Sequence, residues 1–170
     1  MKISREKIKK IAGLLEKEIF LYDNLYDVAA SIQGMLVNND MDELTKLVTR
    51  EDSLFTKAES LRQERLEHMF SLKDELGLSD SEFGLGKLLE FIDETEAAKL
   101  KILRDKLIDN VNKLNEINQK NHLLVDYSLN LNAQLMNLLV NLGQINPVYQ
   151  SSGKLKNAPN GKKRLLDRKI

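Results

Sequence analysis

Residues 100–142 have the sequence LKILRDKLIDNVNKLNEINQKNHLLVDYSLNLNAQLMNLLVNL, which contains neither glycine nor proline. Apolar side chains recur in it every three or four residues, with a mean spacing near 3.5 that is typical of a coiled-coil helix. The seam consists of Leu100, Leu103, Leu107, Val111, Leu114, Ile117, Asn121, Leu124, Ser128, Leu131, Leu135, Leu138 and Leu142. With Asp93 and Glu96 as a start signal and Gly143 as the stop, this pattern predicts one very long helix.

Two positions of this seam, Asn121 and Ser128, are polar. A polar side chain on a helical seam commonly sets the register or the choice of partner helix. We interpret Asn121 mainly in this way, and the same two side chains are also candidates for hydrogen bonds to a bound partner.

Two further helices are predicted before this one. Residues 4–38 carry a stripe with helical spacing, and Ser4 is placed to cap its start. Asp40 and Glu43 resemble a capping box that opens a second helix, which Gly77 ends. Because the connection at Asn39 is so short, these helices should form an antiparallel hairpin. The first stripe is Ile8, Ile11, Leu15, Ile19, Tyr22, Leu25, Ala29, Ile32 and Leu36, and the second is Leu44, Leu47, Leu54, Ala58, Leu61, Met69 and Leu72.

A short segment connects the second and third long helices. Ser79 and Glu82 form another capping box, and the apolar residues Leu85, Leu88, Leu89 and Ile92 follow. The predicted fold is therefore all-α: an antiparallel bundle of three long helices with coiled-coil-like packing, a short connecting helix and a flexible C-terminal tail.

The composition divides the chain into residues 1–143 and residues 144–170. Both prolines, Pro147 and Pro159, lie in the second part, which we expect to be a flexible tail. From Pro147 onward there are seven basic residues and one acidic residue, so the preceding part carries 19 basic and 25 acidic residues. The net charge of zero therefore hides an acidic body and a basic tail. With no secretory signal and no membrane-spanning run, a cytoplasmic protein is expected.

The sequence offers little for catalysis or metal binding. The chain has no cysteine, and its two histidines, His68 and His122, lack metal-ligand spacing. Carboxylates such as Glu16 and Glu18 have the spacing of solvated helix faces. There is also no phosphate-binding glycine loop. We therefore predict no catalytic residues, no metal and no cofactor.

Helix lengths point to a surface for a partner. At 1.5 Å per residue, the first two helices span about 50–55 Å and the third about 74 Å, so roughly 20 Å of the third remains. This remainder should be residues 132–142, which are rich in leucine. An apolar strip without an intrachain partner favours binding of another chain. The alternative is that the connector or the tail folds back over it.

The basic tail, with the run GKKR at residues 161–164, is a weaker candidate site. It could contact nucleic acid or an anionic membrane, and such binding would be sensitive to salt. The run is short and lacks interleaved aromatic residues. We therefore expect no nucleic-acid partner and no stable insertion into a membrane.

Several stretches in order resemble the FlgN-type flagellar export chaperones. They are LLEKEIFLYDNLYD at 14–27, NNDMDELTKLVTREDSLFTKAESLRQERLEHM at 38–69, LNEINQKNHLLVDYSLNLNAQLMNLL at 114–139 and PVYQSSG at 147–153. Arg65 matches a late arginine of the family's second helix. The residues that resemble its Asn-rich segment are Asn118, Gln119, Asn121, Leu124 and Ser128. Tyr149 and Gly153 are placed like its Tyr and Gly after the last helix. The basic tail after Gly153 matches no family pattern.

The resemblance implies a non-enzymatic cytoplasmic chaperone for the hook–filament junction (hook-associated) proteins. Such a chaperone binds the C-terminal segment of its client, prevents premature assembly and delivers it to the flagellar type III export gate, with the export ATPase complex as a further candidate partner. Tyr149 is the candidate gate contact, or alternatively packs on the bundle end. A structural coiled-coil protein that self-associates through the strip is the competing interpretation. The predicted client-binding residues are Asn121, Leu124, Ser128, Leu131, Leu135, Leu138 and Leu142.

Overall fold

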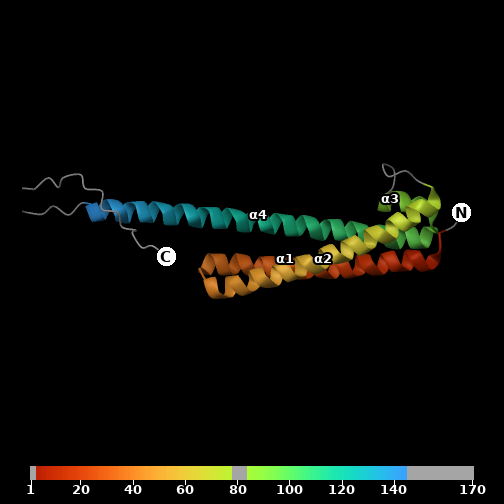
Figure 1. Ribbon diagram of the computed structural model, residues 1–170, viewed down its shortest axis with the longest axis horizontal. Coiled ribbons are helices and arrows are strands. Elements are labelled where there is room, and N and C mark those ends of the chain that lie inside the picture. Colours follow the sequence, from red (N-terminus) through yellow and green to blue (C-terminus); the bar gives the residue numbers. More distant parts are fainter. Residues whose placement is uncertain (1–2, 78–83, 145–170) are drawn as a thin grey trace, which may run out of the picture. The chain divides into compact units, whose positions relative to one another are not determined.

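The computed structural model describes residues 3–77 and 84–144, and their side chains as far as Asn141. Every regular element in this part of the chain is a helix (Figure 1). The elements are α1 (Arg5–Asn38), α2 (Met41–Leu76), α3 (Leu85–Leu88), the 3₁₀ helix η1 (Leu89–Phe91) and α4 (Glu94–Gln144). The all-α class is thus confirmed. The prediction that Gly143 ends the third long helix is wrong by one residue, because α4 continues to Gln144.

Contacts along the chain divide it into two units, Met1–Asp126 and Tyr127–Ile170. The first unit holds α1, α2, α3, η1 and the part of α4 up to Asp126. Of the second unit, the structure describes only the helical residues 127–144. The predicted capping box of Ser79 and Glu82 and the predicted tail, apart from the helical Gln144, lie outside the described residues.

The turn between α1 and α2 is as tight as predicted. Asn39 takes the left-handed conformation at φ 56°, which turns the chain within one residue. Asp40 then caps α2, because its Oδ1 accepts a hydrogen bond from the Glu43 N–H at 3.1 Å. Gly77 ends α2 at φ 66°, as expected of a C-terminal glycine. Ser4 occupies the N-cap position of α1, but its hydroxyl makes no capping bond, so that part of the prediction is wrong.

Ion pairs show that α1 and α2 run antiparallel. Lys10 Nζ lies 3.1 Å from Glu64 Oε1, and Lys7 pairs with Glu75 nearer the start of α1. As the residue number falls along α1, its partner's number rises along α2. The helical hairpin is therefore confirmed.

Contacts show that α1 and the first part of α4 run parallel. Arg5 pairs with Glu96 at 3.1 Å, and Ala29 accepts a hydrogen bond from Asn121 at 2.8 Å. The two residues of each pair are 91 and 92 positions apart in the sequence, respectively. A nearly constant separation is expected when two helices run parallel. Lys99 adds a further pair with Glu16 of α1 at 3.0 Å.

The core of the first unit forms two clusters of buried side chains. One, near the start of α1, joins α1, α2, α4 and the connector, where Leu88 of α3 is fully buried. The other lies further along α1, around Leu25 and Ala29. The connector thus covers the first cluster. The buried α1 residues include the predicted Ile8, Ile11, Leu15, Ile19, Leu25, Ala29 and Ile32.

Candidate protein-binding surface

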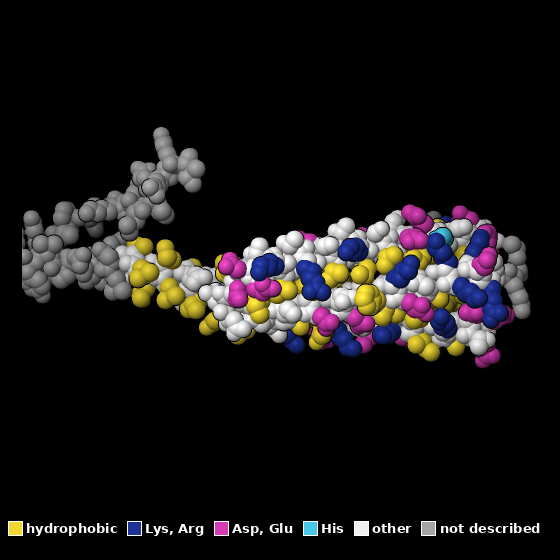
Figure 2. Space-filling model, turned by 90° about the horizontal axis from the view of Figure 1, so that it is seen from below, with side chains coloured by type: hydrophobic (Ala, Val, Ile, Leu, Met, Phe, Trp, Pro, Cys, Tyr) yellow, Lys and Arg dark blue, Asp and Glu magenta, His cyan; other side chains and the backbone are white. Residues whose placement is uncertain are grey.

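Residues 127–141 of α4 form an uncharged helical stretch in which every side chain is exposed. Eight of these side chains are large and apolar: Tyr127, Leu129, Leu131, Leu135, Met136, Leu138, Leu139 and Val140. Figure 2 shows hydrophobic side chains gathered on this last described stretch, whereas the rest of the visible face mixes them with charged ones. A concentration of exposed apolar surface without charges is typical of a protein-binding site.

Helical spacing sorts these apolar side chains into two ridges. Leu131, Leu135 and Leu138 follow one another at steps of four and three, so they share one side of the helix. Leu129, Met136 and Val140 are related by steps of seven and four and share a second side, roughly opposite the first. A helix that is apolar on both sides is one that becomes buried on both sides. We call these sets the leucine ridge and the opposite ridge.

The leucine ridge holds three of the predicted client-binding residues. Leu131, Leu135 and Leu138 are 44%, 49% and 57% exposed, so they are open to a partner. Ser128 is exposed as well. The backbone of Leu142 continues the ridge, but its side chain lies outside the described residues, as does Tyr149, the predicted gate contact.

Asn121 and Leu124 are placed differently, because both belong to the first unit. Asn121 is 8% exposed, and its Nδ2 donates to the carbonyl oxygen of Ala29 in α1. Its Oδ1 is buried and has no hydrogen-bond partner among the described residues. The amide donor therefore bonds within the chain, as expected of a residue that sets helix register, and Leu124 beside it is half-buried.

A second buried asparagine was not predicted. Asn110 is 6% exposed, and its Nδ2 donates both to the Ile19 carbonyl oxygen at 3.3 Å and to Asp23 Oδ1 at 2.8 Å. It precedes Val111 of the predicted seam, and its spacing to Leu114, Ile117 and Asn121 is helical. This spacing could have predicted that Asn110 faces the core. The predicted seam used the adjacent apolar residue, Val111, at this turn of the helix instead.

The prediction that Glu18 lies on a solvated face is wrong. Glu18 is only 1% exposed, and Arg65 of α2 binds it through two parallel hydrogen bonds: Nε to Oε1 at 2.6 Å and Nη2 to Oε2 at 3.1 Å. A carboxylate is stable at such burial only when it is paired. The resemblance singled out Arg65 but named no partner for it, because sequence spacing does not reveal which helices meet.

Two ionisable side chains of the α1–α2 hairpin, Tyr22 and Glu64, have shifted pKa values. Burial, followed by the negative charge of Glu18, raises the pKa of the Tyr22 phenol above its usual value of 10.0. At the surface, the hydrogen bond from Lys10 lowers the pKa of Glu64. Tyr22 lies on α1 and Glu64 on α2.

Within the described residues, no group of three or more acidic, histidine or cysteine side chains could hold a metal ion. His68 and His122 each lie near one carboxylate of their own helix, Glu64 at 3.8 Å and Asp126 at 3.5 Å. A search of the described helices for a stretch long and apolar enough to cross a membrane found none.

These features define an all-helical protein whose most distinctive surface is an uncharged apolar helix. Comparison with protein families places it further: the model of the family described as FlgN protein matches residues 1–157. The chain therefore belongs to the FlgN family of flagellar export chaperones. Searches of curated proteins and of solved structures found no match.

Proposed function

We propose that this chain is a cytoplasmic flagellar export chaperone that binds the C-terminal segment of a hook–filament junction protein on residues 127–142 of α4. The observation that carries the proposal is the leucine ridge, three leucines at helical spacing that remain about half exposed. The family membership supports the export role.

The ridge suits an amphipathic client helix. Leucines at steps of three and four interdigitate with the same pattern on a second helix, as in helix-in-groove recognition. Because residues 127–141 carry no charge, a client that covers them desolvates no ionised group. The same docking would hide the client's own apolar face and so prevent premature assembly.

The remaining parts have separate roles in this proposal. Residues 1–126 act as a three-helix bundle with coiled-coil-like packing that anchors the start of α4. Tyr149 contacts the export gate, and Ser128 adds a hydrogen bond beside the ridge. Asn121, which is buried and donates to Ala29, holds the start of α4 in register on α1. No step of this function requires a catalytic residue.

Co-purification with C-terminal fragments of junction proteins tests the proposal. Leu135→Ser with Leu138→Ser should reduce recovery of the fragment by an order of magnitude or more, because both substitutions place a hydroxyl where the client packs. Leu129→Ser with Met136→Ser, on the opposite ridge, is the matched control and should reduce it less. Equal recovery with all variants would contradict the choice of surface.

Self-association through the same residues is the second candidate function, because the opposite ridge is also exposed. The mass in solution separates the two. A stable homodimer that persists in excess client fragment, and that Leu135→Ser with Leu138→Ser dissociates, would favour a structural coiled-coil protein.

A further inference from the structure

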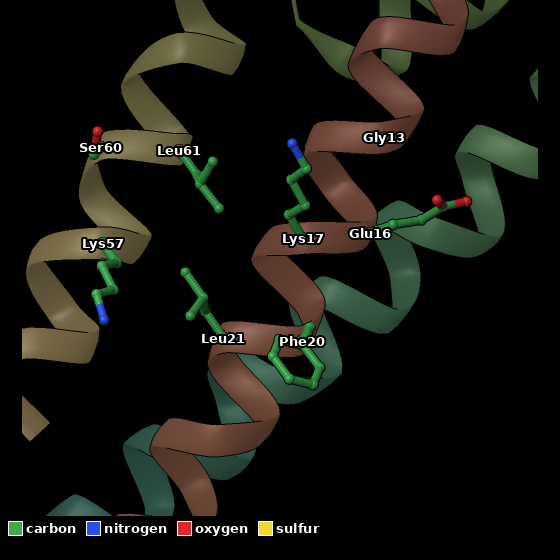
Figure 3. Close-up of a pocket in the computed structure, with 8 residues that line it drawn as sticks. All are labelled: Gly13, Glu16, Lys17, Phe20, Leu21, Lys57, Ser60 and Leu61. Carbon is green, nitrogen blue, oxygen red and sulfur yellow. The ribbon is translucent and has the colours of Figure 1, made fainter. Parts of the chain in front are cut away.

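An open groove of about 700 Å³ lies between α1 and α2 in the first unit, on a surface that the proposed function does not use. Leu21 of α1 and Leu61 of α2 point toward each other across it, and Phe20 stands at its edge (Figure 3). Phe20 is 66% exposed, so a large apolar side chain is available beside the groove. The volume falls in the range of about 300–1,000 Å³ that is common for binding sites.

Gly13 lies at one end of the groove, inside α1. A Cβ atom added there would meet no atom within 4 Å, so no contact within the described structure requires glycine. Glycine inside a helix is unfavourable relative to alanine. The open space over Gly13 leaves room for another backbone to approach α1 closely at this position.

Charge identifies the kind of partner. Lys17 of α1 and Lys57 of α2 line the groove from its two sides, and neither has an ion pair among the described residues. Glu64, whose pKa Lys17 helps to lower, is itself paired with Lys10 at 3.1 Å. Glu16, the acidic residue of the lining, is already paired with Lys99 of α4. The groove therefore presents apolar floor residues between two available positive charges, on a body with more acidic than basic residues.

We propose that this groove binds an amphipathic helix of another protein whose apolar residues are flanked by acidic ones. Leucine-like anchors at helical spacing would pack on Leu21, Leu61 and Phe20, and the flanking carboxylates would face Lys17 and Lys57. The helix would approach most closely at Gly13. This surface is distinct from the leucine ridge, so client and second partner could be bound together.

The two charged segments outside the described structure do not fit the groove. The region after Gly153 is strongly basic, so the two lysines would repel it. Residues 78–83 are acidic, but they are tethered at Gly77, and Lys57 lies about 30 Å from the end of α2. Six extended residues reach about 21 Å and must also return to Gly84, so they fall short.

A labelled peptide of about 15 residues, with leucines at helical spacing and flanking glutamates, is the probe. We expect fluorescence anisotropy to show binding to the full chain. Lys17→Glu with Lys57→Glu should weaken binding by about tenfold or more and should create binding to a matched peptide with lysines in place of glutamates. Equal affinity of the unmodified chain for both peptides would overturn the proposal.

Gly13→Leu tests the position of the helix, since the added side chain enters the open space over α1. It should abolish peptide binding, while Gly34→Leu, at another position of α1 with no atom within 4 Å, should not. Circular dichroism checks that both variants are folded. Unchanged binding to Gly13→Leu would refute the site, and so would a homodimer that Gly13→Leu dissociates, because the groove would then belong to a second copy.

Discussion

Arg65 of α2 and Glu18 of α1 form a bidentate ion pair inside the helical hairpin, with Nε–Oε1 and Nη2–Oε2 distances of 2.6 and 3.1 Å. The Glu18 side chain is 1% exposed and that of Arg65 is 13% exposed. Planar, two-point recognition fixes both the distance and the rotation of the helices at this level. The pair therefore selects one register of the hairpin against neighbouring ones.

Breaking this pair should be costly. Arg65→Met leaves a buried carboxylate without a partner and should lower the free energy of unfolding by about 3–5 kcal/mol, whereas Glu18→Leu with Arg65→Met should restore most of that loss. Arg62→Met removes an exposed pair with Glu59 and should cost less than about 1 kcal/mol. Urea unfolding followed by circular dichroism measures all three. Equal losses for Arg65→Met and Arg62→Met would contradict the buried-pair interpretation.

The two buried asparagines should differ in how much they stabilise the fold. Asn121→Leu removes the bond to Ala29 but also a buried acceptor that has no partner among the described residues, so the two effects offset and the free energy of unfolding should change by less than about 1 kcal/mol. Asn110→Leu removes bonds to Ile19 and Asp23 and should lower it by about 1–2 kcal/mol. Thermal unfolding of both variants is the measurement. An equal loss of stability in Asn121→Leu and Asn110→Leu would contradict the cost assigned to the unpaired Oδ1.

Stability should fall at alkaline pH through Tyr22. Its pKa is raised in the folded state, so the folded chain holds the phenol proton more tightly than the unfolded chain does. The resulting stabilisation is complete below the ordinary pKa of 10.0 and is lost as the pH rises through the raised value. Tyr22→Phe should flatten this part of the urea midpoint–pH profile, and Tyr127→Phe, at an exposed position, should not. A profile unchanged by Tyr22→Phe would contradict the assignment.

Two truncations should separate binding from delivery. Removal of residues 145–170 should leave helicity and client binding intact but impair secretion of the client, because Tyr149 is lost. Removal of residues 154–170 deletes the basic segment but keeps Tyr149, so secretion should be preserved. Tyr149→Ala in the full chain should reproduce part of the larger defect. Normal secretion by Tyr149→Ala would remove that residue from the proposed gate contact.

Helix positions and the core face of α1 could be predicted from the sequence because both depend on local periodicity. Ile8, Ile11 and Leu15 face inward for the same geometric reason that spaces them at three and four residues. Asp40 and Gly77 mark helix ends because capping and the left-handed conformation are local properties of the backbone. The existence of a long apolar seam on α4 was predictable on the same grounds.

The sequence by itself therefore determined which residues are helical and which face of each helix is apolar. Only the tertiary structure decided which apolar positions are covered: Leu114 is buried and Leu135 is half exposed, although they share one seam. It also decided that Glu18 is buried, that Asn121 bonds to α1, and that Gly13 lines a groove. The physical reason is that periodicity is a property of one helix, whereas burial, ion pairing and grooves arise between helices far apart in the chain.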